Sequence, residues 1–425
     1  MCNILRSILS SSENFIYYRI IFCYYKVSEH KSSIFSLTRQ IFFVKACNYH
    51  TFANEKMITN KQTTIMTKTI NGIQVPQRAD FVGSFLRPAD LNDSNRDEYV
   101  AQLVEKQKEL GYTLITDGEF NRTFWHLDFF WGFGGVTHEP GGDIAFNGET
   151  ARLDKVYLTG KLTAQPHPFI EAYKKLKKYE DDKHIAKLTI PAPAQLFQQL
   201  NLPKNFLGTR AIYPNINDLI NDIAAVYQDF IRQFYAVGGR YLQLDDCSWG
   251  AILGSSDAIS IQRYKELGSN LDSIKEQLLT VNNLAIEGRP ADLVVATHIC
   301  RGNYHSTWFN SGAYDSVADW AFARENVDVL YLEYDDERSG GFEPLAKVSA
   351  NKHVVLGLIT TKRPELEDED EVIARIREAA KYIPLERLSL SPQCGFASCA
   401  IGNKLTVEQQ WAKLQLVKRI SEKVW

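Results

Sequence analysis

Several features that mark other classes of protein are missing from this chain of 425 residues. It contains no run of about 18 uncharged apolar residues, so we expect no membrane-spanning helix. The net charge is −3, whereas a nucleic-acid-binding protein would normally carry a basic domain or stripe. Its seven cysteines lack the paired spacing of a disulfide scaffold. They fit a reducing compartment, where cysteine more often binds metal or takes part in catalysis.

Methionine is scarce, and its positions bear on where the folded region begins. The chain contains only Met1, Met57 and Met66. Residues 1–66 hold few acids and include an aromatic, apolar stretch at 15–25 that has no clear period. We expect residues 1–66 to be an N-terminal extension that is disordered, a targeting segment, or upstream sequence translated in error. The predicted location is cytoplasmic, or mitochondrial if this extension is a genuine presequence.

From residue 78 onward, short β-branched or aromatic runs alternate with longer segments of helical pattern. The runs are nearly all apolar, as in parallel strands that are buried on both faces. Eight strand–helix units over about 345 residues predict an α/β fold, a (β/α)8 TIM barrel within residues 67–425, with an inserted hairpin or lid in region 121–183. A doubly wound open sheet is the alternative, although no glycine-rich dinucleotide motif follows a strand. The predicted strands are 80–85, 112–117, 185–190, 241–245, 293–297, 329–333, 354–359 and 388–391, and the predicted helices are 96–110, 216–237, 263–287, 316–326, 344–350, 369–382 and 406–424.

Polar side chains gather where the predicted strands end. In a parallel barrel, catalysis takes place at the C-terminal ends of the strands. A single carboxylate at such a place could simply cap the next helix. Six of the eight strands, however, end in a carboxylate, thiol, imidazole or small hydroxyl group, which indicates a site. These residues are Ser84, Asp117, Glu119, Asp245, Asp246, His298, Cys300, Glu333 and Cys394.

Four of these residues, His298, Cys300, Glu333 and Cys394, form a donor set of the kind that Zn²⁺ takes in tetrahedral geometry. His298 and Cys300 are two residues apart on an extended segment, so their side chains share a face. The spacing alone is weak evidence, because a buried cysteine usually behaves as a small hydrophobic residue. From the residues alone, metal binding and ordinary packing both stay open.

Seven segments resemble, in order and spacing, the catalytic C-terminal barrel of cobalamin-independent methionine synthase. The resemblance covers residues 78–424, and it is closest to the short, single-barrel branch of that family. It implies a TIM barrel of the uroporphyrinogen decarboxylase/methionine synthase type. The segments are Phe81-Val-Gly-Ser-Phe, Asp117-Gly-Glu-Phe-Asn-Arg, Leu188-Thr-Ile-Pro-Ala-Pro, Leu242-Gln-Leu-Asp-Asp, Thr297-His-Ile-Cys, Leu332-Glu and Ser391-Pro-Gln-Cys-Gly.

The resemblance implies a zinc-dependent S-methyltransferase of methionine biosynthesis, with Zn²⁺ bound by the Cys/His/Glu donor set. The methyl group would pass from a folate-type donor, such as methyltetrahydrofolate, to a small thiol, homocysteine, giving methionine. Ser84, Glu119 and Asp245 would hold the amino-acid end of homocysteine. The residue types agree, because the two carboxylates suit an ammonium group and Ser84 can donate a hydrogen bond to a carboxylate. Alternatively, Glu119 pairs with Arg122.

The chain departs from the family pattern around the methyl donor. Lys362 stands where the family has a histidine that handles a proton, and an ordinary lysine does not easily exchange protons near pH 7. Phe197 takes the place of the tryptophan that stacks on the pterin, and it still offers an aromatic face. Residues 396–398 replace the basic residues expected after the last cysteine. Another methylated carrier, such as a corrinoid protein, is therefore an alternative donor.

Three other functions compete with this interpretation. Uroporphyrinogen decarboxylase shares the barrel type but needs no metal, so the Cys/His/Glu set argues against it. A zinc-dependent thiol alkyl transferase with another donor or acceptor is nearer. A barrel that binds zinc or a thiol without catalysis is the non-enzymatic alternative. Cys247 and Cys399 are expected to be structural, and His126 shows no pattern of partners.

Overall fold

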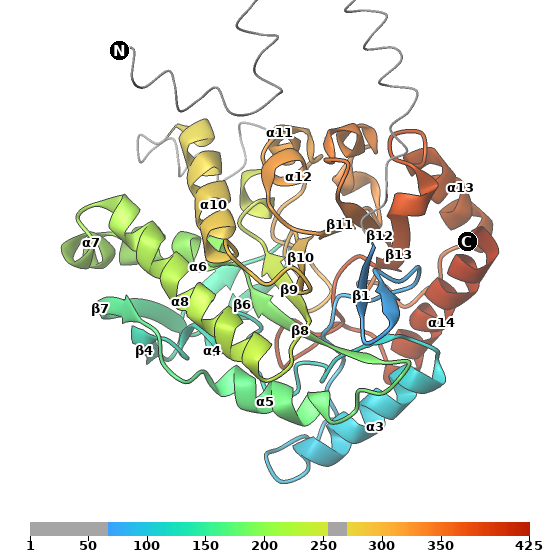
Figure 1. The fold of residues 1–425 in the computed structure, drawn as a ribbon, viewed down its shortest axis with the longest axis horizontal. Helices are drawn as coiled ribbons and strands as arrows, with labels where there is room; N and C mark the ends of the chain where they lie inside the picture. Colours follow the sequence, from blue (N-terminus) through green and yellow to red (C-terminus); the bar gives the residue numbers. More distant parts are fainter. Residues whose placement is uncertain (1–66, 254–269) are drawn as a thin grey trace, which may run out of the picture. The chain divides into compact units, whose positions relative to one another are not determined.

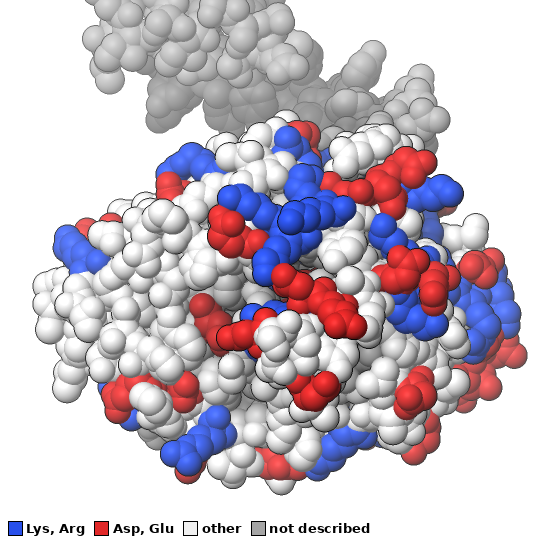
Figure 2. Space-filling view, turned by 90° about the horizontal axis from the view of Figure 1, so that it is seen from below, with Lys and Arg blue, Asp and Glu red and all other residues white. Residues whose placement is uncertain are grey.

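The computed structural model describes residues 67–253 and 270–425 of the chain. The predicted N-terminal extension and the first part of the predicted helix 263–287 lie outside these residues. Within the described ranges, no helix is both long and apolar enough to cross a membrane. On the face shown in Figure 2, basic and acidic side chains lie next to one another, as the small net charge leads one to expect.

Seven parallel strands form the sheet, and their order in space follows their order along the chain. This arrangement confirms the predicted barrel, in which a crossover connection returns each strand to the same end of the sheet. The six strands from β8 to β13 begin and end within two residues of their predicted limits. The strands are β3 (Leu114–Ile115), β8 (Ile185–Pro191), β9 (Tyr241–Asp246), β10 (Val294–Ile299), β11 (Val329–Glu333), β12 (His353–Ile359) and β13 (Leu388–Pro392).

The segment predicted as the first strand closes the barrel between β13 and β3, but it is not a regular strand. On one side, the backbone N–H of Asp80 donates to the carbonyl of Leu390 at 3.0 Å. On the other side, the N–H of Phe85 donates to the carbonyl of Gly118 at 3.1 Å. Between them the backbone turns at Gly83, which has a φ of +152°. This turn interrupts the ladder of hydrogen bonds, so the prediction of a strand was wrong in detail.

Helices lie on the outer side of the strands (Figure 1). Five of them match predicted helices: α3 (Arg96–Glu109), α8 (Ile216–Ala236), α10 (Leu271–Ala285), α13 (Glu369–Ala379) and α14 (Val407–Val424). The predicted helix 316–326 is instead two short helices, α11 (Asp315–Ala318) and α12 (Ala321–Arg324), and the predicted helix 344–350 is a 3-10 turn at Glu343–Lys347. Three further helices each begin with proline at the first turn, where its missing N–H leaves no bond unmade: α5 (Pro168–Lys177), α6 (Pro193–Leu200) and α7 (Pro203–Ile212).

The inserted region after β3 contains a short helix and two antiparallel hairpins, in agreement with the predicted insertion. The helix is α4 (Leu127–Phe130). One hairpin pairs β4 (Gly134–Glu139) with β7 (Lys155–Thr163), and the other pairs β5 (Asp143–Ala145) with β6 (Thr150–Arg152). A separate hairpin of β1 (Lys68–Ile70) and β2 (Ile73–Val75) precedes the barrel.

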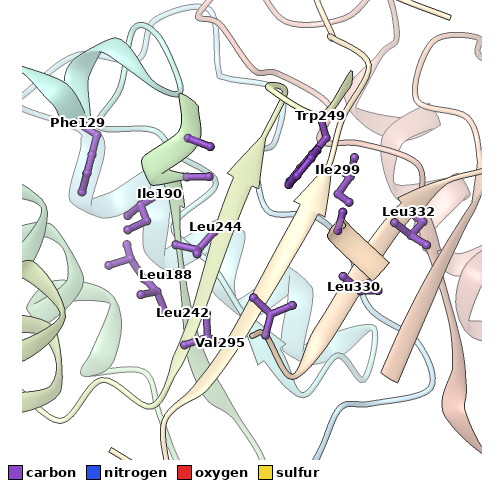
Figure 3. Close-up of a cluster of buried hydrophobic side chains, with 14 of the residues drawn as sticks. Phe129, Leu188, Ile190, Leu242, Leu244, Trp249, Val295, Ile299, Leu330 and Leu332 are labelled. Carbon is purple, nitrogen blue, oxygen red and sulfur yellow. The ribbon is translucent and has the colours of Figure 1, made fainter. Parts of the chain in front are cut away.

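Successive side chains of each strand point to opposite faces of the sheet, so the buried side chains form two layers. One set, including Leu242 and Leu244 on β9, joins the large core between strands and helices (Figure 3). The other set, including Tyr241 on β9 and Tyr331 on β11, forms a smaller cluster inside the barrel. Two residues further along β9, this inward-facing set continues with Gln243 and then Asp245. The inside of the barrel therefore changes from apolar to polar toward the C-terminal ends of the strands.

Candidate metal and amino-acid binding site

A pocket with a cavity of about 210 Å³ opens at the C-terminal ends of the strands. It collects side chains that follow β9, β10 and β13 and others from the inserted region. Ser84, Glu119, Asp245, His298, Cys300 and Cys394 all line it. Six of the residues that sequence analysis selected therefore come together from distant parts of the chain in one pocket.

The predicted donor set forms a compact cluster at the base of this pocket. One ligand atom from each of His298, Cys300, Glu333 and Cys394 lies within 4.8 Å of the others. The Sγ atom of Cys300 is 3.7 Å from that of Cys394 and 3.6 Å from Oε1 of Glu333. All four side chains are buried. Four donors of this kind at this separation suit a single ion of the size and preference of Zn²⁺.

The carboxylate of Glu333 is held in place by the loop that follows β10. The backbone N–H of Arg301 donates to Oε2 of Glu333 at 2.9 Å, and the guanidinium lies 3.6 Å from the same oxygen. The hydroxyl of Tyr314 accepts the backbone N–H of Glu333 at 2.9 Å. These contacts leave Oε1 directed at Cys300. Outer contacts of this type orient the groups that bind a metal.

The imidazole of His298 has an unused hydrogen-bonding capacity that fits a metal ligand. Its side chain is 1% exposed, and neither Nδ1 nor Nε2 has a hydrogen-bond partner. A buried polar atom without a partner is costly and calls for an explanation. A bound ion would give one of the two nitrogens its partner, and the two sulfur atoms and the carboxylate beside it supply the rest of the donor set.

Without a cation, the acidic groups of the cluster do not all ionise together. Interactions with the thiols of Cys247 and Cys394 lower the pKa of Cys300 well below its usual value. Interaction with Cys300, followed by burial, raises the pKa of Cys394 well above its usual value. Burial, followed by the charge of Cys300, raises the pKa of Glu333 to about 8. Mutual repulsion of acidic groups without a cation explains this split, since a cation would favour all three ionised forms together.

Glu119 presents one carboxylate oxygen to the pocket and anchors the other. Oε1 accepts a hydrogen bond from Oγ1 of Thr189 at 2.7 Å and lies 3.3 Å from the guanidinium of Arg122. Oε2 is buried and has no hydrogen-bond partner. The pairing of Glu119 with Arg122 therefore exists, and it leaves an oxygen available for a ligand.

Asp245 and Ser84 complete the group predicted to hold an amino acid. Gln243 donates to Oδ1 of Asp245 at 2.8 Å. Burial raises the pKa of Asp245 to about 7, with Glu119 adding to the rise and His298 opposing it. Two carboxylates so close together favour a positively charged partner. The hydroxyl of Ser84 accepts the backbone N–H of Ala397 at 3.3 Å, so its proton is free to be donated.

The outer wall of the pocket combines amide and apolar side chains. Amide residues from α6 and from the loop after β10 include Gln195, whose Oε1 is buried without a partner, and Asn303. The second hairpin of the insertion covers the wall, because Phe146, just beyond β5, packs on Tyr304 and Phe309 with ring centroids 5.2 and 5.7 Å apart. The insertion thus forms part of the pocket, where it excludes water.

Two residues predicted near the methyl donor occupy other surroundings. Phe197 is 5% exposed and belongs to the hydrophobic core, while its neighbours Gln195, Gln198 and Gln199 line the pocket. Lys362 is 7% exposed, and its ammonium group is tied to the loop after β10. It donates to Oδ1 of Asn303 at 2.9 Å and to the carbonyls of Thr307 and Gly302 at 3.2 and 3.5 Å.

Cys247 and His126 are among the titratable residues that line the pocket but were not selected by sequence analysis. Cys247 was expected to be structural; the neighbouring Cys300 thiol, followed by burial, raises its pKa well above the usual value. It lies two residues beyond Asp245, so the alternation along β9 was the signal that could have placed it inside. Burial lowers the pKa of His126 to about 3, which keeps this imidazole neutral. No motif marks His126 in the sequence.

Comparisons with known proteins identify the family of this chain. Residues 213–418 match the family model described as "Cobalamin-independent synthase, Catalytic domain". The chain is 40% identical over 389 residues to the uncharacterized protein YxjG of Bacillus subtilis (strain 168), covering 87% of this chain and all of that one. It is 23% identical over 306 residues to methionine synthase of Pyrococcus horikoshii, covering 72% of this chain and 77% of that one.

A solved structure extends the likeness to three dimensions. The putative vitamin-B12 independent methionine synthase from Listeria monocytogenes is 34% identical and superposes with a TM-score of 0.63. The match covers 83% of this chain and 98% of that one. Sequence, fold and the cluster of Cys, His and Glu side chains therefore lead to one conclusion. The chain belongs to the cobalamin-independent methionine synthase family.

Proposed function

We propose that this protein is a zinc-dependent S-methyltransferase that transfers a methyl group from a folate-type donor to homocysteine, giving methionine. The observation that carries the proposal is the buried cluster of His298, Cys300, Glu333 and Cys394 at the base of the pocket. Membership of the family supports the reaction type. A zinc ion held by this cluster would keep the acceptor thiol deprotonated and nucleophilic at neutral pH, where a free thiol is mostly protonated.

The remaining residues of the pocket suit the amino-acid end of homocysteine. Oε2 of Glu119 lacks a partner, and Asp245 adds a second carboxylate toward an ammonium group. Ser84 has a hydroxyl proton to donate to the acceptor's carboxylate. These three groups line the same pocket as the thiols, so one short molecule can present its amino-acid end to one group and its sulfur to the other.

The methyl donor would occupy the outer part of the pocket, between α6 and the hairpin of the insertion. Apolar and aromatic side chains there would exclude water from the transferred methyl group. Gln195 and Asn303 offer amide groups for the hydrogen-bonding edge of a pterin. Sequence analysis placed Lys362 and Phe197 near the donor, but we propose supporting roles for them: Lys362 fixes the loop after β10, and Phe197 packs α6 into the hydrophobic core.

A second candidate keeps the acceptor and changes the donor. Among the described residues that line the pocket, Arg301 is the one with a permanent positive charge, and its guanidinium donates to the carbonyl of Gly312 and to the hydroxyl of Tyr314. A polyglutamate tail needs free cations. This observation favours a donor without a long anionic tail, including another methylated carrier.

The test begins with the full chain and its metal content. Elemental analysis should find about one zinc ion per chain, because the cluster offers one donor set. Cys300→Ser and Cys394→Ser should lose zinc and methionine formation together, whereas Cys399→Ser, a change at another buried thiol of the pocket, should keep its zinc. Full activity of a zinc-free Cys300→Ser variant would contradict the proposal. Parallel assays with monoglutamyl and polyglutamyl methyltetrahydrofolate, and with a methylated corrinoid, separate the two donors.

A further inference from the structure

A second imidazole lines the pocket, apart from the metal cluster. Among the described residues that line the pocket, the histidines are His298 of the cluster and His126, which stands directly before α4 in the inserted region. His126 is only 7% exposed. The backbone N–H of its neighbour Trp125 donates to the carbonyl of Ser398 at 3.0 Å, which ties this segment to the loop after β13. The proposed metal site therefore leaves the imidazole of His126 without a role.

Packing holds the ring of His126 in a fixed orientation. Its centroid lies 4.6 Å from that of the Trp125 ring, and the ring of Phe130 meets it edge to face at 6.0 Å. Nδ1 of His126 is buried and has no hydrogen-bond partner. A buried polar atom without a partner is costly and calls for an explanation, which a ligand in the pocket would provide.

His167 shows how a structural imidazole in the same region differs. Its Nε2 lies 3.0 Å from the carbonyl of Phe129 on α4, and its Nδ1 accepts the backbone N–H of Phe169 at 3.3 Å. Burial lowers the pKa of His167 to about 4 and that of His126 to about 3, so both rings are uncharged near pH 7. Both nitrogens of His167 are thus used within the protein, whereas His126 faces the pocket with unused capacity.

A second uncharged group of the pocket also lacks a partner. Oε1 of Gln195 on α6 is buried without a hydrogen bond, and Gln195 lines the pocket together with Leu202 and Pro203 at the junction of α6 and α7. The charge of Lys204 in α7 contributes to the lowered pKa of His126, so the imidazole lies toward this junction. A neutral imidazole donates at one nitrogen and accepts at the other, and an amide oxygen accepts. Such groups suit an uncharged ligand that has both N–H groups and acceptors.

We propose that His126 is a specificity residue for the methyl donor and hydrogen-bonds the polar edge of an uncharged heterocycle. The inference rests on the proposed function, because it places a folate-type donor in the outer part of the pocket. The edge of a pterin carries N–H donors beside ring and carbonyl acceptors, so it complements a neutral imidazole and an amide. A cationic methyl donor would gain little from a side chain that stays uncharged.

The test separates the two substrates in steady-state assays of the zinc-loaded full chain with homocysteine and monoglutamyl methyltetrahydrofolate. His126→Phe keeps a ring against Trp125 and removes both nitrogens. The KM for methyltetrahydrofolate should rise on the order of tenfold, as expected for the loss of one buried hydrogen bond. The KM for homocysteine and the zinc content should stay at their wild-type values. An unchanged KM for methyltetrahydrofolate would overturn the proposal.

His126→Asn and His126→Gln return a hydrogen-bonding group near one or the other ring nitrogen. At least one of them should regain part of the lost affinity for methyltetrahydrofolate, and a KM as high as that of His126→Phe in both would assign the ring to packing and overturn the proposal.

His167→Phe is the matched control, because it makes the same change at a buried imidazole whose nitrogens are bonded within the protein. It should lower stability and keep both KM values. A zinc-loaded wild type that makes no methionine from methyltetrahydrofolate would instead contradict the folate donor of the proposed function, and the role of His126 would fall with it.

Discussion

Glu119 lines the pocket with a backbone conformation that is unfavourable for an L residue. Its φ of +63° lies in the left-handed region, which an L residue with a long side chain adopts at a cost of about 1 kcal/mol or more. The carboxylate of Asp117 accepts the backbone N–H of Glu119 at 2.9 Å and holds this conformation. Backbone strain that persists at a pocket is typical of functional sites.

We predict that Glu119→Gln raises the KM for homocysteine on the order of tenfold or more, because a charge-assisted bond to the ammonium group is lost. Zinc content should not change, since Glu119 is outside the metal cluster. The comparison is with 2-mercaptoethanol, a thiol without an ammonium group, as acceptor. Equal losses for both thiols would show that the variant damages the site as a whole, contrary to the role we assign.

Lys362 supports the site through a loop. Its ammonium group donates to three oxygens of the segment that follows Cys300, at Asn303, Thr307 and Gly302. Lys362→Met leaves these oxygens without their donor, so we expect kcat to fall roughly tenfold through misplacement of the loop, with zinc retained. Lys362→His should not restore activity. A His variant that matches the wild type, with a new pH dependence near 6.5, would instead assign this position to proton transfer.

The members of the cluster could be predicted because each one lies within two residues of the end of a strand whose apolar pattern is visible in the sequence. The sequence does not show that the side chain of Phe197 points into the core. Packing around α6 determines which face of this helix is buried. Cys247 and His126 were missed for a different reason. Both lack a motif, and only the register of β9 or the path of the insertion brings them to the pocket.

At the level of elements, a buried ion pair stabilises the segment 80–85, which closes the barrel without forming a regular strand. The closing segment has few ladder hydrogen bonds, but Nζ of Lys187 on β8 lies 3.1 Å from Oδ1 of Asp80. The hydroxyl of Tyr331 on β11 donates to the other oxygen of Asp80, and Tyr241 lies 3.0 Å from Tyr331. Side chains from three strands thus replace part of the backbone ladder where the barrel closes.

We predict that Lys187→Met lowers the free energy of unfolding by about 3–5 kcal/mol, because it leaves the carboxylate of Asp80 buried without its cation. The double variant with Asp80→Asn should regain part of this loss, since no unpaired charge remains. Urea denaturation of the four proteins of the cycle measures both effects. Strictly additive losses would show that the two side chains do not act as a pair.

The strands and helices differ in how well the sequence predicts them. Continuous apolar runs define β8 to β13 because both faces of these strands are buried. The closing segment was predicted as a regular strand, which it is not, and helices α5, α6 and α7 were not predicted. In the first, a turn at Gly83 interrupts an otherwise suitable run. In the three helices, proline looks like a break in the pattern although it stands at a helix start, where it is favoured.

Across the whole molecule, the barrel interior is layered from apolar to charged. Its inner cluster of apolar side chains, which includes Tyr241 and Val294, is followed by the Asp80–Lys187 pair and then by the carboxylates and thiols of the pocket. The alternation of side chains along the strands places these residues inside the barrel. Strand β9 carries both Tyr241 of the inner cluster and Asp245 of the pocket, so residues for stability and for the site share a strand.

Three buried histidines should make the folded protein sensitive to acid. Burial lowers the pKa of His126 to about 3, of His167 to about 4 and of His353 to about 3. In the unfolded chain these groups titrate near pH 6.5, so the unfolded state binds more protons between about pH 4 and 6.5. Stability therefore rises with pH in this range, is complete above about pH 6.5 and is lost on acidification.

The three histidines together contribute up to about 4 kcal/mol per pH unit to the slope of unfolding free energy against pH, because each proton contributes about 1.4. His353→Gln should reduce the slope by about one proton, since Gln does not titrate but can still donate to the hydroxyl of Ser389, which lies 2.7 Å from Nε2 of His353. Urea denaturation of both proteins at several values between pH 4.5 and 7 measures the difference. Carboxylates that titrate in the same range contribute equally to both proteins, so their effect cancels in this comparison. Equal slopes for the wild type and His353→Gln would mean that His353 is protonated in the folded state, contrary to the effect of its burial.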